Sequence, residues 1–207
     1  MDTAQTKIIG IDISHYQHQV DWVQVKASGN QFAFIKASEG TSIDPLYRLH
    51  VEAARREGII VGSYHFFHPK ADPVIQARTM IDATQGCFIG DLPHVLDVEL
   101  ADGLKVLGAQ AADNVLKFLQ FVESATGMTP IIYTAASFFL GEQNPSAFAR
   151  YPLWVANYGV STPKLPAPWK DWKFWQYSEH QPVPGVGKID ADFFNGSMAD
   201  LQAMTKK

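Results

Sequence analysis

Eight short apolar runs rich in β-branched residues are spaced along this chain of 207 residues. Helical patterns separate the first five runs, whereas segments rich in proline and tryptophan join the last three. The candidate strands are Ile8–Ile13, Phe32–Lys36, Ile59–Phe66, His94–Glu99, Ile131–Thr134, Leu153–Ala156, Lys173–Tyr177 and Lys188–Asp192. Strands that alternate with helices form a parallel sheet, and eight strands is the number that closes a barrel filled by side chains. The sequence therefore predicts an α/β fold: a single modified β/α barrel of five β/α units closed by three further strands, with residues 1–207 as one domain.

Three of the connecting segments carry explicit helix signals. Asp44–Glu57 is rich in Leu, Ala, Arg and Glu, and Pro73–Gln85 opens with a proline directly after Asp72, a residue that caps helices well. Leu104–Thr126 is the longest candidate and stops at a glycine. An open doubly wound sheet is the alternative to a barrel, but no glycine-rich phosphate-binding turn follows the first strand.

Composition argues against several classes of protein. The 17 basic and 21 acidic residues give a net charge of −4, which disfavours a nucleic-acid-binding protein with a basic face. No run approaches the roughly 18–20 apolar residues of a membrane span. The single cysteine, Cys87, excludes an intrachain disulfide and a multi-cysteine metal site. We therefore expect no nucleic-acid partner, no membrane partner and a monomer.

Polar residues gather where the predicted strands end, which is where the active site of a β/α barrel forms. They are Asp12, Lys36, Glu39, Tyr64, His65, Asp97, Glu99, Tyr133, Trp154, Gln176, Asp190 and Asp192. Ionisable side chains are rarely buried without a partner or a task, so this end of the barrel is the predicted functional site.

Asp97 and Glu99 form the sharpest signal in this group. Side chains alternate along a strand, so these two carboxylates point to the same face, with Cα atoms roughly 6.5–7 Å apart. Paired carboxylates at about this spacing suit glycosidic cleavage, in which one acid protonates the leaving oxygen. Their proximity also favours a raised pKa on one of the pair. The alternative is a structural pair of carboxylates held by Lys36 or by an arginine.

Aromatic residues near the strand ends provide a second signal. They are Tyr64, Phe66, Tyr133, Trp154, Tyr158, Trp172, Trp175 and Tyr177. Each could belong to the core, because aromatic rings dominate cores by area. Together they favour a polymeric carbohydrate ligand, because aromatic faces stack on sugar rings while Asp, Gln and Tyr groups bind hydroxyls.

A metal site is the less favoured interpretation. His65 and His68 lie near the predicted carboxylates, but they would face opposite sides of a continuing strand. The sequence also lacks a Gly-x-Ser-x-Gly turn, which disfavours a common type of hydrolase. We therefore expect no metal and no cofactor.

The motifs at the strand ends resemble, in their order, those of the glycoside hydrolase family 25 muramidases, which include lysozymes and endolysin catalytic domains. The matching stretches are Gly10–Ser14, Phe34–Gly40, Gly62–Phe66, Leu96–Glu99, Pro130–Thr134, Leu153–Ala156, Trp175–Ser178 and Ile189–Asp190. The resemblance extends from Ile9 to about Gly196 and implies the same barrel of five β/α units and three further strands.

The resemblance also implies an activity, namely hydrolysis of the β-1,4 bond between N-acetylmuramic acid and N-acetylglucosamine in peptidoglycan glycan strands. By position, Glu99 matches the general acid and Asp97 the second carboxylate. The implied substrate-binding residues are Asp12, Tyr64, Tyr133, Trp154, Gln176 and Asp190. Asp97 could act as nucleophile, activate water, or orient the 2-acetamido group of the substrate. The last role is favoured, because the implied substrate carries that group.

Other functions remain as alternatives at this point. A chitinase-like glycosidase would carry Asp-x-x-Asp-x-Asp-x-Glu, but Leu92 and Val95 stand at its first two aspartate positions. A metal-dependent deacetylase or amidase and a non-catalytic peptidoglycan-binding barrel are the others. The implied place of action is the bacterial cell wall, outside the cell or in the periplasm. Since Met1–Gly10 shows no signal-peptide pattern, we expect export by another route or a leader already removed.

Overall fold

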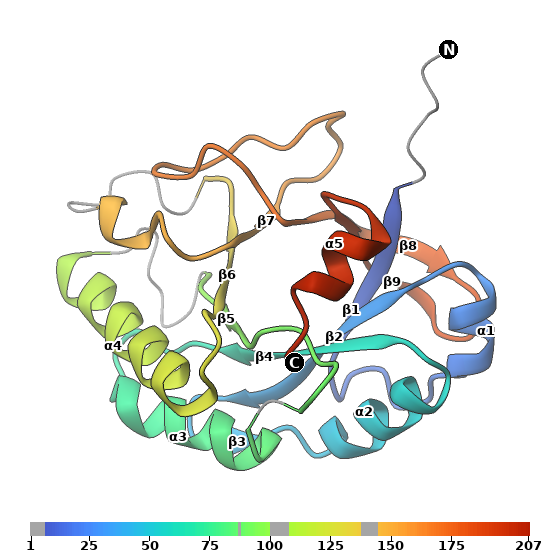
Figure 1. Ribbon diagram of the computed structural model, residues 1–207, viewed down its shortest axis with the longest axis horizontal. Helices are drawn as coiled ribbons and strands as arrows, with labels where there is room; N and C mark the ends of the chain where they lie inside the picture. Colours follow the sequence, from blue (N-terminus) through green and yellow to red (C-terminus); the bar gives the residue numbers. More distant parts are fainter. Residues whose placement is uncertain (1–6, 87, 100–107, 138–144) are drawn as a thin grey trace.

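The computed structural model describes residues 7–86, 88–99, 108–137 and 145–207, and in it eight strands close into a barrel (Figure 1). The barrel strands are β1 Ile8–Ile13, β2 Phe32–Glu39, β4 Ile60–Phe66, β5 Val95–Asp97, β6 Ile131–Ala135, β7 Leu153–Ala156, β8 Phe174–Val183 and β9 Gly187–Phe194. A short ninth strand, β3 Ser42–Ile43, pairs with the outer end of β2. Cys87 and the expected helical residues 104–107 lie outside the described residues.

The strands pair in parallel from β1 through β8, and only β9 runs antiparallel to both of its neighbours in the barrel. The pairing of β1 with β2 completes the ring. On the other side of β1, β9 closes the barrel in a register that places Asp12 opposite Asp190. The predicted eight-stranded barrel is therefore confirmed.

Helices cover the outside of the first part of the barrel (Figure 1). They are α1 Trp22–Ala27, α2 Tyr47–Arg56, α3 Pro73–Thr84 and α4 Ala109–Thr126, and α5 Met198–Ala203 follows the last strand. The Asp72 side chain accepts hydrogen bonds from the Val74 and Ile75 amides and so caps α3, while Gly127 ends α4 with a left-handed φ of 72°. None of the described helices combines the length and apolar character that a membrane crossing requires.

The connection after β6 differs from the expected fifth β/α unit. In its described part this connection carries the 3₁₀ helix Pro145–Phe148 and no α-helix. Proline and glycine punctuate this stretch of sequence, and the 3₁₀ helix is the short form of helix that such a connection accommodates.

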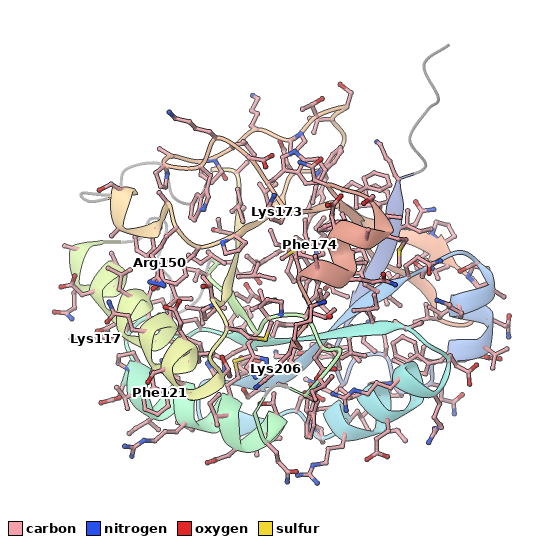
Figure 2. All side chains as sticks on the ribbon, viewed as in Figure 1. Lys117, Phe121, Arg150, Lys173, Phe174 and Lys206 are labelled. Carbon is pink, nitrogen blue, oxygen red and sulfur yellow. The ribbon has the colours of Figure 1, made fainter. Side chains whose placement is uncertain are left out.

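Aromatic rings fill the lower part of the barrel interior, which is the part toward the N-terminal ends of the parallel strands. Phe34 of β2 stacks on Trp154 of β7 with ring centroids 4.4 Å apart, and it meets the edge of Phe174 of β8 at 4.9 Å. Phe174 is labelled in Figure 2. Two glycines make room for these rings. A Cβ atom on Gly62 would lie 2.3 Å from carbons of the Phe34 ring, and one on Gly10 would lie 2.6 Å from the Phe32 ring.

Replacing Gly62 by alanine should therefore destabilise the barrel. Phe34 is fully buried between other rings and cannot retreat, so Gly62→Ala should lower the free energy of unfolding by about 1–3 kcal/mol. Urea denaturation measures this change. Gly108→Ala is the control: its Cβ would enter open space at the start of α4, and it should cost about 1 kcal/mol or less. Equal stability of Gly62→Ala and the wild type would contradict this account of the interior.

Candidate active site

A cavity of about 310 Å³ opens at the end of the barrel where the parallel strands terminate. Its lining contains all eight residues that the sequence predicts for the site, namely Asp12, Tyr64, Asp97, Glu99, Tyr133, Trp154, Gln176 and Asp190. They come from seven different strands and from the residue two positions beyond the end of β5. The strand alternation places them there, because each shares the inner face of its strand with the residue two positions away, and Val95, Ile131 and Phe174 at such positions belong to the packed interior.

Backbone hydrogen bonds fix the position of the two central carboxylates. The Phe67 amide donates to the Asp97 carbonyl at 3.0 Å, and the Val98 amide donates to the Tyr133 carbonyl at 2.9 Å. The second bond continues the ladder between β5 and β6 beyond the end of β5. Glu99 therefore leaves the barrel rim in a defined direction and lines the same cavity as Asp97.

Hydrogen bonds among side chains form a fixed floor beside these carboxylates. Gln176 donates through Nε2 to Asp12 Oδ2 at 2.7 Å and accepts at Oε1 from the hydroxyls of Tyr133 and Tyr158 at 2.8 and 2.5 Å. On β7, the Trp154 indole donates to Asp192 Oδ1 at 2.8 Å. A rigid floor of this kind suits the binding of a ligand in one orientation.

One buried carboxylate oxygen in the cavity lacks a hydrogen-bond partner among the described residues. Asp97 Oδ1 is buried and receives no hydrogen bond from the residues that the structure describes. Within that part of the chain, no ion pair joins Asp97 or Glu99 to a lysine or arginine, in contrast to the structural alternative considered from the sequence. A buried acceptor without a donor is costly, so a ligand that supplies an N–H or O–H group at this point would be stabilised.

The electrostatics of the cavity favour retained protons. Burial raises the pKa of Asp97 well above its usual value, and the charges of Glu99 and Asp12 raise it further, while Lys36 opposes them. Burial also raises the pKa of Glu99 against the pull of Lys36. On the opposite wall, burial and then the charge of Glu179 raise the pKa of Asp190 to about 6. Together these three carboxyl groups can therefore hold a transferable proton near neutral pH, as general acid catalysis requires.

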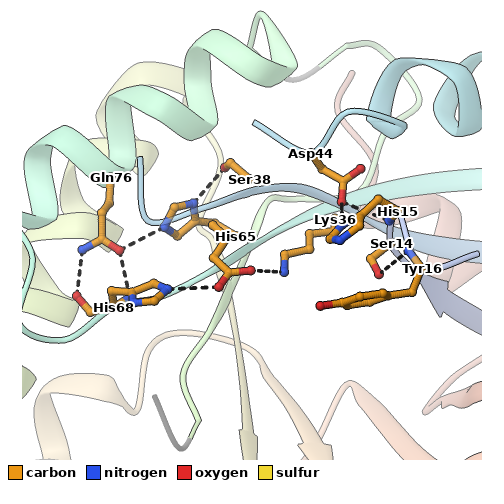
Figure 3. Close-up of polar contacts among 10 residues, drawn as sticks. Ser14, His15, Tyr16, Lys36, Ser38, Asp44, His65, His68 and Gln76 are labelled. Atoms are coloured by element: carbon orange, nitrogen blue, oxygen red, sulfur yellow. Dashed lines mark hydrogen bonds and ion pairs between the residues drawn. The ribbon is translucent and has the colours of Figure 1, made fainter. Parts of the chain in front are cut away.

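The histidines considered as metal ligands are engaged elsewhere. Ser38 Oγ lies 2.8 Å from His65 Nδ1, and Gln76 Oε1 lies 3.2 Å from His65 Nε2 (Figure 3). Burial lowers the pKa of His65 to about 4, so its ring is neutral at neutral pH. His65 thus faces α3 on the outside of the barrel wall, away from Asp97. The described residues contain no group of three or more candidate ligands that could hold a metal ion.

The chain matches a known protein family over most of its length. Residues 11–186 match the model of the family described as glycosyl hydrolases family 25. The chain belongs to this family. It is 38% identical to the uncharacterized protein YegX of Escherichia coli, covering 97% of this chain and 74% of that protein. It is 37% identical to lysozyme M1 of Streptomyces globisporus, covering 94% and 70%.

A solved structure supports the same assignment. The bacterial lysozyme from Streptomyces coelicolor superimposes on this family 25 chain with a TM-score of 0.88 and 36% sequence identity, covering 99% of this chain and 98% of the other. The modified barrel is therefore the fold that this glycoside hydrolase shares with a lysozyme of known structure.

Further residues line the cavity of this family 25 chain beyond the predicted set. They include Tyr16, Lys36, Phe66, Tyr158 and Glu179. Lys36, Phe66 and Tyr158 belong to the strand-end residues that the sequence singles out, although the predicted set of eight does not include them. Tyr16 and Glu179 lie in a loop and in the extended hairpin of β8, where no sequence pattern indicated a position at the cavity.

The buried Asp192 provides a test of the electrostatics. Burial, followed by the charge of Asp12, raises its pKa well above the usual 3.8, so the folded protein keeps a proton that the unfolded chain has released. Wild-type stability therefore falls as pH rises through this window, by up to roughly 1.4 kcal/mol per pH unit. Asparagine cannot titrate and still offers an oxygen to the Trp154 indole.

We expect Asp192→Asn to gain stability relative to the wild type as the pH is raised from about 4 to about 7. Urea denaturation of both proteins at the two pH values measures the difference. A difference in the free energy of unfolding that stays constant between them would contradict a raised pKa at Asp192.

Proposed function

We propose that this family 25 enzyme is a muramidase that hydrolyses the β-1,4 bond between N-acetylmuramic acid and N-acetylglucosamine in peptidoglycan glycan strands. Family membership supports the reaction class, and the relative in Streptomyces globisporus and the structure from Streptomyces coelicolor are both named as lysozymes. The observation that carries the proposal is the cavity itself, in which Asp97 and Glu99 lie together among aromatic rings and hydrogen-bonding side chains.

In the proposed mechanism Glu99 is the general acid that protonates the leaving glycosidic oxygen. Asp97 assists by accepting a hydrogen bond from the 2-acetamido N–H of the substrate at its unpartnered Oδ1. A hydrogen bond to the charged form of a carboxyl lowers its pKa. Substrate binding would thus favour the ionised form of Asp97 and leave the proton that the pair retains on Glu99. The acetamido oxygen, oriented in this way, is then the group that attacks the anomeric carbon.

The remaining lining residues bind the glycan in this proposal. Tyr64, Tyr133 and Trp154 offer ring faces or hydroxyls to the sugars, and Asp12, Gln176 and Asp190 offer oxygens and an amide. The chain would act as one catalytic domain and as a monomer, without a metal or cofactor. Its place of action would be the bacterial cell wall.

Substitution of Glu99 tests the role of the acid. Glu99→Gln keeps the size and hydrogen-bonding capacity of the side chain but removes the transferable proton, so turnover of purified peptidoglycan should fall by roughly 10²–10⁴-fold. Circular dichroism should show an unchanged fold. Glu52→Gln, on the exposed face of α2, is the matched control and should keep full activity. A Glu99→Gln enzyme that clears cell walls at nearly the wild-type rate would exclude Glu99 as the acid.

The identity of the cleaved bond is a separate prediction. Both sugars of peptidoglycan carry an acetamido group, so the chemistry of Asp97 and Glu99 suits either anomeric carbon. A muramidase creates new reducing ends on N-acetylmuramic acid. Borohydride reduction of the digest followed by mass spectrometry should therefore find muramitol at the new ends. Reduced glucosamine there would replace the muramidase with a glucosaminidase and leave the proposed roles of the two carboxylates intact.

A further inference from the structure

A second cavity of about 690 Å³ lies beside the proposed active site and is more than twice as large. Lys36 lines both cavities, so the two spaces adjoin at its side chain. The loop after β1 borders both as well, because His15 faces the second cavity and the neighbouring Tyr16 faces the first. A ligand in the proposed active site therefore lies next to the second cavity.

Charged side chains fixed by hydrogen bonds form the wall of this second cavity (Figure 3). A β-bulge between Lys36 and Ser38 puts Glu39 on the same side of β2 as Lys36, and the two form an ion pair. His68 Nε2 lies 3.1 Å from the other oxygen of Glu39. Burial alone would raise the pKa of Glu39, but hydrogen bonds from Lys36 and His68 outweigh it and lower that pKa, so Glu39 is ionised at neutral pH.

Hydrogen bonds also fix Asp44 and His15, which line the same cavity. Asp44 has only 1% of its side chain exposed and accepts hydrogen bonds from the His15 amide at 3.0 Å and the His15 ring at 2.7 Å. In contrast, the side chains of Glu39, His15 and His68 remain 42%, 33% and 31% exposed. These three groups are therefore held in place and can still contact a ligand.

The rim of the second cavity includes an open strand edge. β3 stands at the end of the sheet order, so β2 is its one strand neighbour among the described elements. Ser42 and Ile43 of β3 are exposed and line the cavity, as does the exposed Lys70. An open strand edge presents unpaired backbone N–H and C=O groups, which suit the amide groups of a bound peptide.

We infer that this second cavity binds the stem peptide that muramic acid carries on its lactyl ether. The inference rests on the proposed function, since it assumes that the first cavity holds the sugars at the cleaved bond. A stem peptide has amide groups, free carboxylates and, in many walls, an amine. These match the strand edge of β3, the cations Lys36 and Lys70, and the carboxylate of Glu39.

The contrast between the two cavities favours a peptide over further sugar units as the occupant. The first cavity is rich in Tyr, Phe and Trp side chains, the groups that stack on sugar rings. The described lining of the second cavity contains no Phe, Tyr or Trp, and instead holds six ionisable side chains: His15, Lys36, Glu39, Asp44, His68 and Lys70. Neutral acetylated sugars have little use for such charges, whereas peptide carboxylates and amines do.

The test compares two substrates, glycan strands that carry stem peptides and the same strands from which an amidase has removed the peptides. The measured quantity is the ratio of kcat/KM on the first substrate to kcat/KM on the second. Wild-type enzyme should prefer the peptide-bearing strands. Lys70→Glu should reduce the ratio by about three- to tenfold by repelling stem carboxylates. Ser42→Tyr should reduce it by filling the cavity, with the loss mainly in KM.

Lys117→Glu is the matched control, because Lys117 is exposed on α4 outside both cavities (Figure 2). Its ratio should equal that of the wild type. A wild-type ratio near one, or variants that keep the wild-type ratio, would overturn the peptide site while the proposed function stands. An equal loss on both substrates would also overturn it and assign the cavity to the glycan. A wild-type enzyme without activity on either substrate would instead overturn the proposed function, and the peptide site with it.

Discussion

The alternation of side chains in a closed barrel is the constraint on which the rest of this structure depends. Once β9 pairs with β1 and completes the ring, every second residue of each strand must point inward. The lower inward positions hold rings such as Phe34 and Phe174, which exclude water. The inward positions above them hold Asp12, Asp97 and their neighbours. Packing of the lower layer therefore supports the polar layer, and a disturbed ring would also displace the carboxylates above it.

Concentrating carboxyl groups in this way opposes folding. Burial raises the pKa values of Asp12, Asp97, Glu99, Asp190 and Asp192, which means that their ionised forms are disfavoured in the folded protein. The structure offsets the cost in part, through hydrogen bonds from Gln176 and Trp154 and through the charge of Lys36. The pKa values nevertheless remain raised, and this suits acid catalysis, because a carboxyl group that resists ionisation keeps a proton available for donation at neutral pH.

Much of this arrangement could be predicted from the sequence because it follows from patterns of period two. The run Leu153–Ala156 coincides with β7, and all eight residues that the strand-end rule assigned to the site line the cavity, together with others. The count of five β/α units includes a helix where α1 lies, but its six residues are too few for periodicity to give its bounds. Elements without a pattern were missed, namely α5 with six residues and β3 with two. The continuation of β8 beyond Tyr177 is polar and partly exposed, so hydrophobicity did not indicate it. The second cavity arises from a β-bulge and a loop, which leave no periodic signal.

Lys36 lies between the proposed active site and the second cavity and lines both. It stands on an inward position of β2, next to the carboxylates whose pKa values it lowers, and its ammonium group pairs with Glu39 at the start of the second cavity. In peptidoglycan the acetamido group is common to both sugars, whereas the lactyl ether and its peptide distinguish muramic acid. Discrimination between the sugars therefore has to come from groups outside the two carboxylates to which we assign the chemistry. A charged cavity adjoining the reacting centre at one lysine meets that requirement, because it can select the substituted sugar without altering Asp97 or Glu99.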